Sequence, residues 1–450
     1  MLRLDRFLLS FALFTLTAAA PTSIDPFDGY HVVLDGGSTG TRIYIYTVAN
    51  HLRLVEPVRI NGTQWAVKTN PGLSSIMPEQ VDDYLKPLLS AVVEQVPETE
   101  RKRTTIALRA TAGMRLLPEY RRQALLAAVM RAFKSQTPFQ VDSYSALVIP
   151  GEFEGAFGWV TANYLQNKLT LHGAQTNAYI DLGGASAQIT FEPLSPPLAG
   201  DFPVVLDGTR HELYTHSYLR FGIVQAHGRY YAGLKRDSTP GLDGVYEDPC
   251  LWKPDPMHLD ASFEVKAIMV NNNGDSTEET IHVRGSGDPA KCEALVYKYS
   301  LMHGSHAQEY LCTQPPCTIL GVHQPPIPSY MQVNAVSNFA EVAQLHKCAT
   351  KENNFMAPAT CIRDIFRKAC STMNLAEAAN VYSVRGDALN RVCFQAIYVY
   401  SLSTNVFRIK DTSLVRWADD LKGSDLGWSL GSILYDVSQR QTIYVQRNDI

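Results

Sequence analysis

Two turns in the sequence combine an aspartate with several glycines, a composition suited to binding phosphate. The first aspartate, Asp35, ends the apolar segment 31–35 and is followed by the turn 36–42. The second, Asp181, ends the apolar segment 178–181, and a turn with two adjacent glycines follows it. Glycines let the backbone approach a phosphate closely, and consecutive backbone N–H groups can form an anion-binding nest. The pattern therefore predicts two phosphate-binding loops.

The two aspartates need a separate explanation, because a carboxylate repels phosphate. Both are suited to hold a hard cation that bridges the phosphates, directly or through water. The hydroxyl groups of Ser38, Thr39 and Ser186 add hydrogen-bond donors to the turns. Two ordinary hairpin turns are the alternative, and the repetition of the whole pattern argues against them. Neither turn has the glycine spacing of a Walker loop or of a dinucleotide-binding loop.

A third segment supplies candidate general bases. Phosphoryl transfer to water needs a group that accepts a proton from the water or orients it. Glu152 and Glu154 are two residues apart, so an extended backbone would point both to the same side. If the segment instead begins a helix, both can be solvated acids that the helix dipole favours. The residue pattern does not choose between these two glutamates.

These residues require a framework that brings distant segments together. Alternation and β-branched content predict strands at 31–35, 43–46, 105–108, 178–181 and 189–191. We predict helices from Pro118, over 155–169 and over 430–435, and the first has an apolar stripe. The stripe consists of Leu125, Leu126, Val129, Met130 and Phe133. Proline-rich loops are expected at 192–203 and 314–328.

The strand–turn–strand unit occurs twice, which we interpret as an internal duplication. It predicts an α/β fold of two lobes with the two turns facing each other across a cleft. That is the arrangement of the actin, sugar-kinase and heat-shock ATPase superfold, also called ribonuclease H-like. Such a comparison indicates the fold and not the reaction.

Composition narrows the class of protein. The 450 residues are 45% hydrophobic and 19% charged, which indicates a globular chain with a substantial core. The formal charge of -4 gives no reason to expect a nucleic acid partner. Arg3 and Arg6 precede an apolar run that ends in small residues at 18–20, so residues 1–20 are predicted to be a signal peptide. An uncleaved anchor is the alternative; after cleavage we expect no membrane anchor.

The cysteines also indicate export. All eight lie between Cys250 and Cys393, and an even number in an exported chain predicts disulfides. No pair has the Cys-x-x-Cys spacing of a structural zinc site. Asn61 begins an Asn-Gly-Thr glycosylation sequon. We therefore expect a secreted, extracellular glycoprotein.

The sequence resembles the nucleoside triphosphate diphosphohydrolase family, the ecto-apyrases. Five segments characteristic of that family occur here in order: 34–42, 110–117, 154–165, 181–188 and 423–431. The likeness extends from about residue 30 to about residue 436. Five ordered motifs are far more specific than any one of them.

The resemblance implies a role for each site residue. Glu154 matches the catalytic base, and Ser186 and Gln188 match groups that position the attacking water. Asp35 and Asp181 match acids that hold the metal through its waters, near Trp428. Phosphate contacts are implied for Ser38, Thr39, Gly40, Thr111 and Gly184. The expected cofactor is Ca²⁺ or Mg²⁺.

Some positions depart from the family pattern. Phe153 replaces a second glutamate, Pro150 replaces Ser or Thr, and Ala187 stands where Thr or Ser is usual. We expect the first two changes to alter how the interlobe hinge is held.

The base-binding residues are unknown. The positions that match the family's base-stacking aromatics carry Ala340 and Val392, which cannot stack. Candidate replacements are Phe339, Tyr382 and Tyr398.

The resemblance also implies lobe limits and disulfide pairs. The first lobe is expected at 27–150 plus 416–450 and the second, with the disulfides, at 151–415. The implied pairs are Cys250–Cys292, Cys312–Cys317 and Cys370–Cys393, which leaves Cys348 and Cys361 for the fourth.

The implied function is that of a secreted apyrase. It would remove terminal phosphates from nucleoside tri- and diphosphates by metal-assisted, in-line attack of water. The alternatives are a secreted nucleotide-binding protein without turnover and a polyphosphatase on the same superfold.

Overall fold

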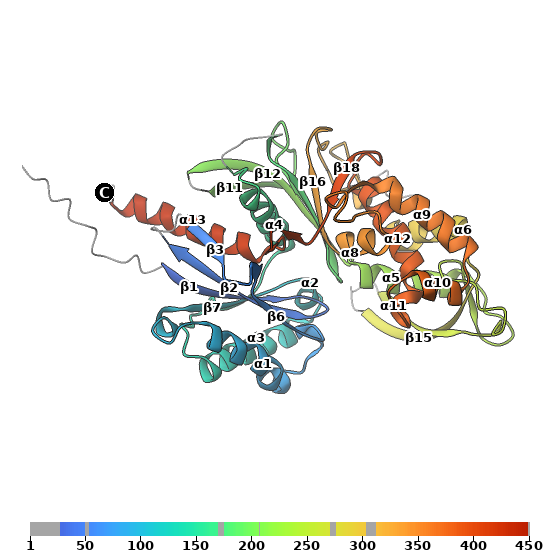
Figure 1. The fold of residues 1–450 in the computed structure, drawn as a ribbon, viewed down its shortest axis with the longest axis horizontal. Helices are drawn as coiled ribbons and strands as arrows, with labels where there is room; N and C mark the ends of the chain where they lie inside the picture. The colour runs from blue at the N-terminus through green and yellow to red at the C-terminus, as the bar shows by residue number, and fades with distance from the viewer. Residues whose placement is uncertain are drawn as a thin grey trace, which may run out of the picture.

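The protein folds around two mixed β-sheets (Figure 1). The computed structural model describes residues 28–49, 54–169, 175–206, 208–270, 276–302 and 312–448. The predicted signal peptide, residues 1–20, lies outside the described residues. Among the residues that are described, no helix combines the length and the apolar character that crossing a membrane requires.

The first sheet has the strand order β3–β2–β1–β7–β8, with β6 also paired to β2. Its strands are β1 (Gly29–Gly36), β2 (Thr41–Ala49), β3 (Leu54–Pro57), β6 (Ala66–Thr69), β7 (Thr105–Ala110) and β8 (Ala146–Val148). β1 is antiparallel to β2 and parallel to β7. A small hairpin, β4 (Arg59–Ile60) and β5 (Thr63–Gln64), lies beside it.

The second sheet repeats this topology. Its order is β11–β12–β10–β9–β16–β18–β17. Its strands are β9 (Ala178–Leu182), β10 (Ser186–Phe191), β11 (Asp201–Leu206), β12 (Thr209–Leu219), β16 (Val333–Ser337), β17 (Met356–Pro358) and β18 (Leu414–Trp417). β9 is antiparallel to β10 and parallel to β16, as β1 is to β2 and β7. The predicted two-lobed actin-like α/β fold is confirmed.

One face of the first sheet is covered by α1 (Val81–Gln95) and α3 (Glu119–Gln136) (Figure 1). Within the predicted stripe of α3, Leu125, Val129 and Phe133 are fully buried against the sheet. Leu126 and Met130 are partly buried beside them. The helix begins after Pro118, as predicted.

Two helices lie between the sheets: α4 (Gly151–Leu165) and α13 (Ser429–Asn448) (Figure 1). Both helices contribute to the hydrophobic clusters that cover the inner faces of the sheets. Phe153 of α4 packs edge-on against Tyr435 of α13, with ring centroids 5.9 Å apart. The position where the family pattern has a glutamate thus carries a ring that joins the two helices.

Two sequence predictions of secondary structure were wrong. Helix α4 begins at Gly151 and not at Gly155, so the segment with the two glutamates is helical and not extended. The proline-rich loop predicted at 192–203 ends earlier, because 201–203 opens β11. Pro203 is tolerated there because β11 is an edge strand.

The outer part of the second lobe is mainly helical and carries the disulfides. Its helices are α5 (Ile223–Asp237), α6 (Pro289–Val296), α8 (Asn338–Leu345), α9 (Ala359–Thr372), α10 (Leu375–Val381), α11 (Asp387–Asn390) and α12 (Val392–Ser401). A three-stranded sheet adds β13 (Tyr246–Asp248), β14 (Phe263–Val270) and β15 (Ser276–Gly285). The bonded pairs are Cys250–Cys292, Cys312–Cys317, Cys348–Cys361 and Cys370–Cys393. All four predicted pairings are confirmed.

Between β18 and α13 the chain forms a hairpin of β19 (Asp420–Leu421) and β20 (Ser424–Asp425). β18 still pairs with β16 in the second sheet, whereas α13 contacts β1 and β3 of the first sheet and β11 of the second. After Trp417 the chain therefore runs to a position between the two sheets. The exact lobe limits remain a prediction.

Candidate active site

The two glycine-rich turns meet at the centre of the molecule. The first joins β1 to β2, and the second joins β9 to β10. A Cβ atom added to Gly184 would lie 2.5 Å from Ser38 Oγ and 2.9 Å from Thr39 Cγ2, so the turns are in direct contact range. A cleft of about 310 Å³ separates the lobes at this point.

The cleft brings together most of the site residues that the sequence predicted. Those that line it are Asp35, Ser38, Thr39, Gly40, Thr111, Glu154, Asp181, Gly184, Ser186 and Trp428. Gln188 lies one layer behind them, where its Nε2 donates to Ser186 Oγ at 2.7 Å. The roles that the resemblance implies for these residues stay predictions.

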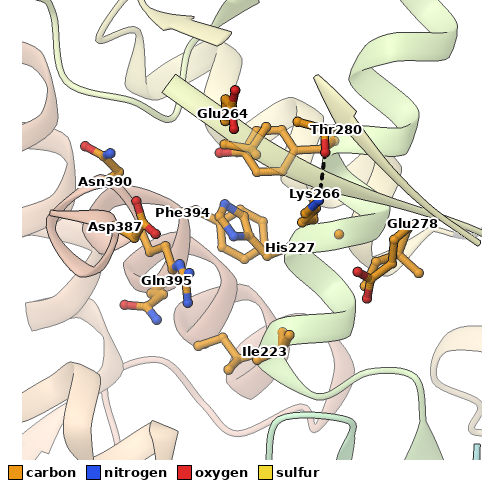
Figure 2. A pocket seen from close by; sticks show the side chains of 16 residues that line it. Ile223, His227, Glu264, Lys266, Glu278, Thr280, Asp387, Asn390, Phe394 and Gln395 are labelled. Carbon is orange, nitrogen blue, oxygen red and sulfur yellow. Dashed lines mark hydrogen bonds between the residues drawn. The ribbon is translucent and has the colours of Figure 1, made fainter. Parts of the chain in front are cut away.

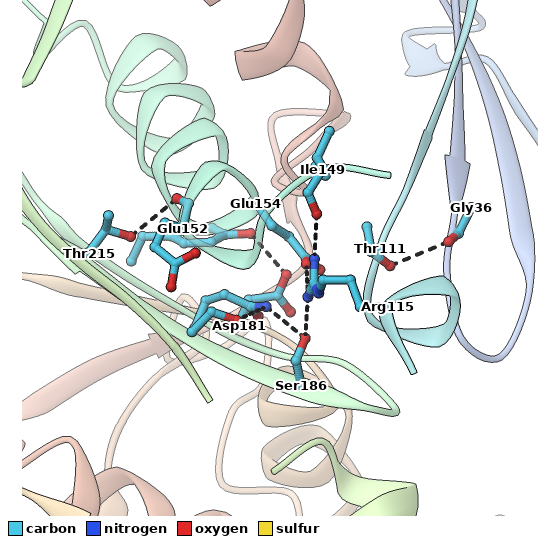
Figure 3. A network of polar contacts seen from close by, with 12 residues as sticks. Gly36, Thr111, Arg115, Ile149, Glu152, Glu154, Asp181, Ser186 and Thr215 are labelled. Carbon is cyan, nitrogen blue, oxygen red and sulfur yellow. Dashed lines mark hydrogen bonds and ion pairs between the residues drawn. The ribbon is translucent and has the colours of Figure 1, made fainter. Parts of the chain in front are cut away.

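Glu154 is buried in the first turn of α4 and paired with an arginine that follows strand β7 of the first sheet. Arg115 ends the short helix α2 (Ala112–Arg115), and its Nη2 donates to Glu154 Oε2 at 2.9 Å and to Ser186 Oγ at 3.1 Å (Figure 3). The other nitrogen, Nη1, donates to the carbonyl oxygen of Ile149. Burial raises the pKa of Glu154, and the charge of Arg115 offsets part of this rise.

The helical start of α4 separates the two glutamates. Residues two apart on a helix differ by about 200° around the axis, so their side chains cannot share a side. Glu154 faces the cleft, whereas Glu152 is partly exposed and is not one of the residues that line it. The carbonyl oxygen of Glu152 accepts from Thr215 Oγ1 on β12 (Figure 3). Geometry therefore favours Glu154 as the base.

Ser186 lines the cleft, and Gln188 is hydrogen-bonded to it from behind. Gln188 Nε2 donates to Ser186 Oγ and to Ser217 Oγ, at 2.7 and 3.1 Å. Its amide oxygen Oε1 is buried and has no partner among the described residues. An acceptor without a protein partner can receive a hydrogen bond from a water molecule.

The aspartates of the two turns carry raised pKa values. Burial raises the pKa of Asp35 to about 7 and that of Asp181 to about 7, and the charge of Glu154 adds to both rises. Asp181 Oδ1 is buried without a hydrogen-bond partner among the described groups. Carboxylate oxygens crowded in this way are what a hard divalent cation or its water shell binds. Among the described residues no three His, Cys, Asp or Glu side chains converge to hold an ion directly, so the two aspartates would hold a divalent cation through its waters.

The cleft also contains charged residues to which the sequence assigned no role. Arg42 and Lys68 line it from the first lobe, and Asp419 and Asp425 line it from the chain after β18. Arg42 Nη1 lies 3.8 Å from Asp35 Oδ2. Arg115, Arg42 and Asp425 fall inside the family-like segments 110–117, 34–42 and 423–431. Their charge, within segments that resemble the family motifs, was the signal by which the sequence could have indicated them as cleft residues.

The structure buries the three candidate base-binding residues. Phe339 and Tyr398 are fully buried, and Tyr382 is 5% exposed, all within the core of the second lobe. The hydroxyl of Tyr398 donates to the carbonyl oxygen of Phe221, which orients the ring inward. Phe339 lies on the buried face of α8, Tyr398 lies on that of α12, and Tyr382 packs against the core directly after α10.

A second cavity adjoins the cleft. It has about 340 Å³ and shares Ile223 and Val224 of α5 with the cleft (Figure 2). The partly exposed ring of His227 lies at its wall, 4.3 Å from the ring centroid of Phe394. Burial lowers the pKa of His227 to about 3, so the imidazole is neutral at physiological pH. The periodicity of apolar residues in the sequence did not indicate that His227 and Phe394 would lie together.

Comparison with known proteins agrees with the geometry. Residues 25–447 match the GDA1/CD39 (nucleoside phosphatase) family. The chain is 28% identical to ectonucleoside triphosphate diphosphohydrolase 5 of Ailuropoda melanoleuca, over 93% of this chain and 90% of that protein. It is 29% identical to ectonucleoside triphosphate diphosphohydrolase 1 of Rattus norvegicus, over 90% and 80%.

Among solved structures, nucleoside triphosphate hydrolases from Neospora caninum share the fold. The TM-score is 0.63 at 15% identity, over 92% of this chain and 93% of that chain. This likeness supports the fold only, whereas the sequence match covers nearly the whole chain. The chain therefore belongs to the GDA1/CD39 (nucleoside phosphatase) family and is a nucleotide-hydrolysing enzyme.

Proposed function

We propose that the protein is a secreted apyrase that removes the terminal phosphate of nucleoside tri- and diphosphates. The observation that carries this proposal is the convergence of Glu154 and Ser186 beside two facing phosphate-type turns in one cleft, with Gln188 hydrogen-bonded to Ser186 from behind. A protein that only sequesters nucleotides has no need of a buried carboxylate at this position. A nucleotide hydrolase needs one to accept a proton.

The protein side of the reaction follows from the positions of these groups. Backbone N–H groups and hydroxyls of the two turns bind the terminal phosphates. The oxygen of the water molecule attacks phosphorus in line, and Glu154 accepts a proton from this water. The bond from phosphorus to the bridging oxygen breaks. Ser186 and the unpaired Oε1 of Gln188 orient the water. The leaving nucleotide carries the electron pair of the broken bond.

Family members of the apyrase kind depend on divalent cations, and we propose that Ca²⁺ or Mg²⁺ serves here. Asp35 and Asp181 would hold the ion through its waters, with Trp428 close by in the same cleft. When bound, the ion neutralises charge on the phosphates. The free oxygen of Asp181 supports this assignment.

We propose that the nucleoside end of the substrate occupies the neighbouring cavity. The cavity and the cleft share the lining residues Ile223 and Val224, so the nucleoside end of a nucleotide whose phosphates lie between the turns would have this cavity as its neighbour. The cavity is lined by the aromatic side chains of His227, Tyr231 and Phe394, by aliphatic side chains and by charged groups of both signs. Stacking on an aromatic side chain is possible for any base, because every base has a π-face, and it discriminates little among bases.

Secretion is proposed from two independent features. The predicted signal peptide occupies residues 1–20, and all eight cysteines are paired. The sequon residue Asn61 is exposed at the tip of the β4–β5 hairpin, where a glycan would have space. Nucleoside tri- and diphosphates are the proposed partners, and neither a nucleic acid nor a membrane anchor is part of the proposal.

A phosphate-release panel on the purified mature chain tests the proposal. ATP, ADP, UTP and UDP should each release phosphate in the presence of Ca²⁺ or Mg²⁺, and a chelator should stop the release reversibly. Long-chain polyphosphate serves as the comparison substrate. Nucleotide binding without release would establish the sequestering alternative, and faster release from polyphosphate would establish the polyphosphatase.

A further inference from the structure

Arg229 is a buried cation that pairs with no carboxylate of the described residues. It lies on α5 and is 5% exposed. Its Nη1 donates to the carbonyl oxygen of Arg220, and its Nη2 donates to that of Ser300 at 2.6 Å. The guanidinium also lies over the ring of Phe221, 4.6 Å from the ring centroid. A buried charge without an opposite charge beside it is costly, so the presence of this guanidinium needs an explanation.

The segment that Arg229 holds is the corner between β12 and α5, residues 220–224. Arg220 has φ 72°, a left-handed conformation that a residue other than glycine keeps only where surrounding contacts hold it. A second buried group holds the same corner, because the hydroxyl of Tyr398 on α12 donates to the carbonyl oxygen of Phe221 at 2.6 Å. Two donors from the core thus bind the carbonyl groups of consecutive residues in the corner.

The corner in turn binds the second glycine-rich turn. Its backbone N–H groups donate to the carbonyl oxygens of residues 183, 184 and 185, which join β9 to β10. The bonds run from Ile223 to Gly183 at 2.9 Å, from Val224 to Gly184 at 3.0 Å and from Arg220 to Ala185 at 2.7 Å. The two segments are also in close contact, since a Cβ atom added to Gly222 would lie 2.2 Å from the backbone nitrogen of Ala185.

These bonds decide which backbone groups the second turn can offer to a ligand. In a planar trans peptide the C=O and the N–H point in opposite directions. Because the carbonyl oxygens of Gly183 and Gly184 face the corner, the N–H groups of Gly184 and Ala185 point away from it. All three residues line the cleft. A turn that binds an anion needs this arrangement, in which N–H groups are presented and carbonyl oxygens are turned aside.

We propose that Arg229 and Tyr398 are positioning residues for the second phosphate-binding turn. They hold the carbonyl groups of residues 220 and 221, and the corner therefore stays where its N–H groups can bind the turn. A guanidinium suits this task because its planar fork donates to Arg220 and to Ser300 at once, and a charged donor forms the stronger hydrogen bond. The inference rests on the phosphate-binding role of the turns in the proposed function.

Two substitutions remove these donors, and a third is a matched control. Arg229→Met removes the guanidinium and keeps a long side chain in its place, whereas Tyr398→Phe removes only a hydroxyl. Tyr230→Phe is the control. Like Tyr398, Tyr230 is fully buried and its hydroxyl donates at 2.6 Å, but the acceptor is Asp248 Oδ1 and not the corner. Tyr230 is also the neighbour of Arg229 on α5, so this variant reports general damage to the helix.

The probe is imidodiphosphate, a non-hydrolysable analogue of pyrophosphate that has two phosphates and no nucleoside. Isothermal titration in the presence of Mg²⁺ measures its dissociation constant. This constant should rise about three- to tenfold in Arg229→Met and in Tyr398→Phe, the scale of one hydrogen bond, and stay within about twofold in Tyr230→Phe. Amide hydrogen exchange over residues 183–188 should be faster in the first two variants and unchanged in the control.

In the activity assay, KM for ATP should rise in Arg229→Met and Tyr398→Phe by more than kcat falls, because the turn already binds the phosphates in the ground state. Unchanged imidodiphosphate affinity in the folded variants would overturn the inference and leave the proposed function intact. An equal loss of affinity in Tyr230→Phe would also overturn it, since the effect would then be general damage. If Arg229→Met does not fold, Tyr398→Phe decides. A protein without substitutions that binds no imidodiphosphate would overturn both the inference and the phosphate-binding role of the turns.

Discussion

Replacing Glu154 with glutamine is the sharpest test of the proposed chemistry. The side chain is 8% exposed, and Arg115 lies 2.9 Å from Oε2. Glutamine has nearly the same shape and keeps an oxygen that can accept from Arg115. It cannot accept a proton from water at neutral pH. The substitution therefore removes base catalysis and leaves the phosphate contacts of the two turns in place.

The expected loss follows from what a general base contributes. Such a group is worth about 10²–10⁴-fold in rate, or roughly 3–5 kcal/mol of transition-state stabilisation. KM should change little, because Glu154 repels rather than binds the phosphates. The variant also leaves the largely buried Arg115 without its charged partner. Some loss of thermal stability is expected from this, since an unpaired buried charge is costly.

Phosphate release measures turnover, and isothermal titration with a non-hydrolysable nucleotide measures binding. Melting curves establish that the variant is folded at the assay temperature. Glu152→Gln is the matched control: it is two residues away on the same helix, outside the cleft, and should stay within about threefold of the original rate. A folded Glu154→Gln enzyme with more than a tenth of the original turnover would refute the reasoning. So would a Glu152 variant that is the inactive one.

Three further predictions concern charge and selectivity. Arg115→Met should move the acidic limb of the pH–rate profile to higher pH, because the cation that offsets the raised pKa of Glu154 is lost; an unmoved limb would show that Arg115 does not act on the base. In chelator, the free energy of unfolding should fall as pH rises from about 4 to about 7. The folded state retains protons on Asp35 and Asp181, with pKa values of about 7, that the unfolded state has released. Added Ca²⁺ or Mg²⁺ should reduce this fall in melting curves without abolishing it, because buried Asp248, whose pKa is raised to about 6, lies outside the cleft; a flat chelator profile would contradict the prediction. Purine and pyrimidine triphosphates should have kcat/KM values within about tenfold of one another, a spread of roughly 1.4 kcal/mol; a hundredfold preference would reveal a formed base pocket.

The sequence by itself determined the features that depend on local pattern. The two aspartate–glycine turns follow from residue type and spacing, because a turn's conformation depends mainly on its own residues. The strands that end in Asp35 and Asp181 follow from short apolar runs, and β1 and β9 occur where those runs predicted them. The repeated unit then implied two lobes, since each copy needs its own sheet.

Tertiary structure decided what depends on contacts between distant segments. The resemblance indicated Glu154 as the base, and the physical distinction from Glu152 came from the start of α4 at Gly151, which sends the two side chains to different sides. Its partner Arg115 follows strand β7 of the first sheet and lies 39 residues away in sequence. No local sequence pattern specifies the pairing of Arg115 with Glu154, because the two residues meet only when the two sheets pack around α4 and α13.

The same limit explains why the sequence suggested buried aromatic residues as base-binding candidates and assigned no role to some residues of the cleft. Phe339 is aromatic and near the expected position, but helix packing directed its ring into the core. Asp419 and Ser337 carry no motif, and they meet because β16 and β18 are neighbours in the second sheet. Sequence determines which chemistry is available along the chain. The packing of the two sheets decides which groups of that chemistry face one another, because burial and hydrogen bonding are properties of the assembled fold.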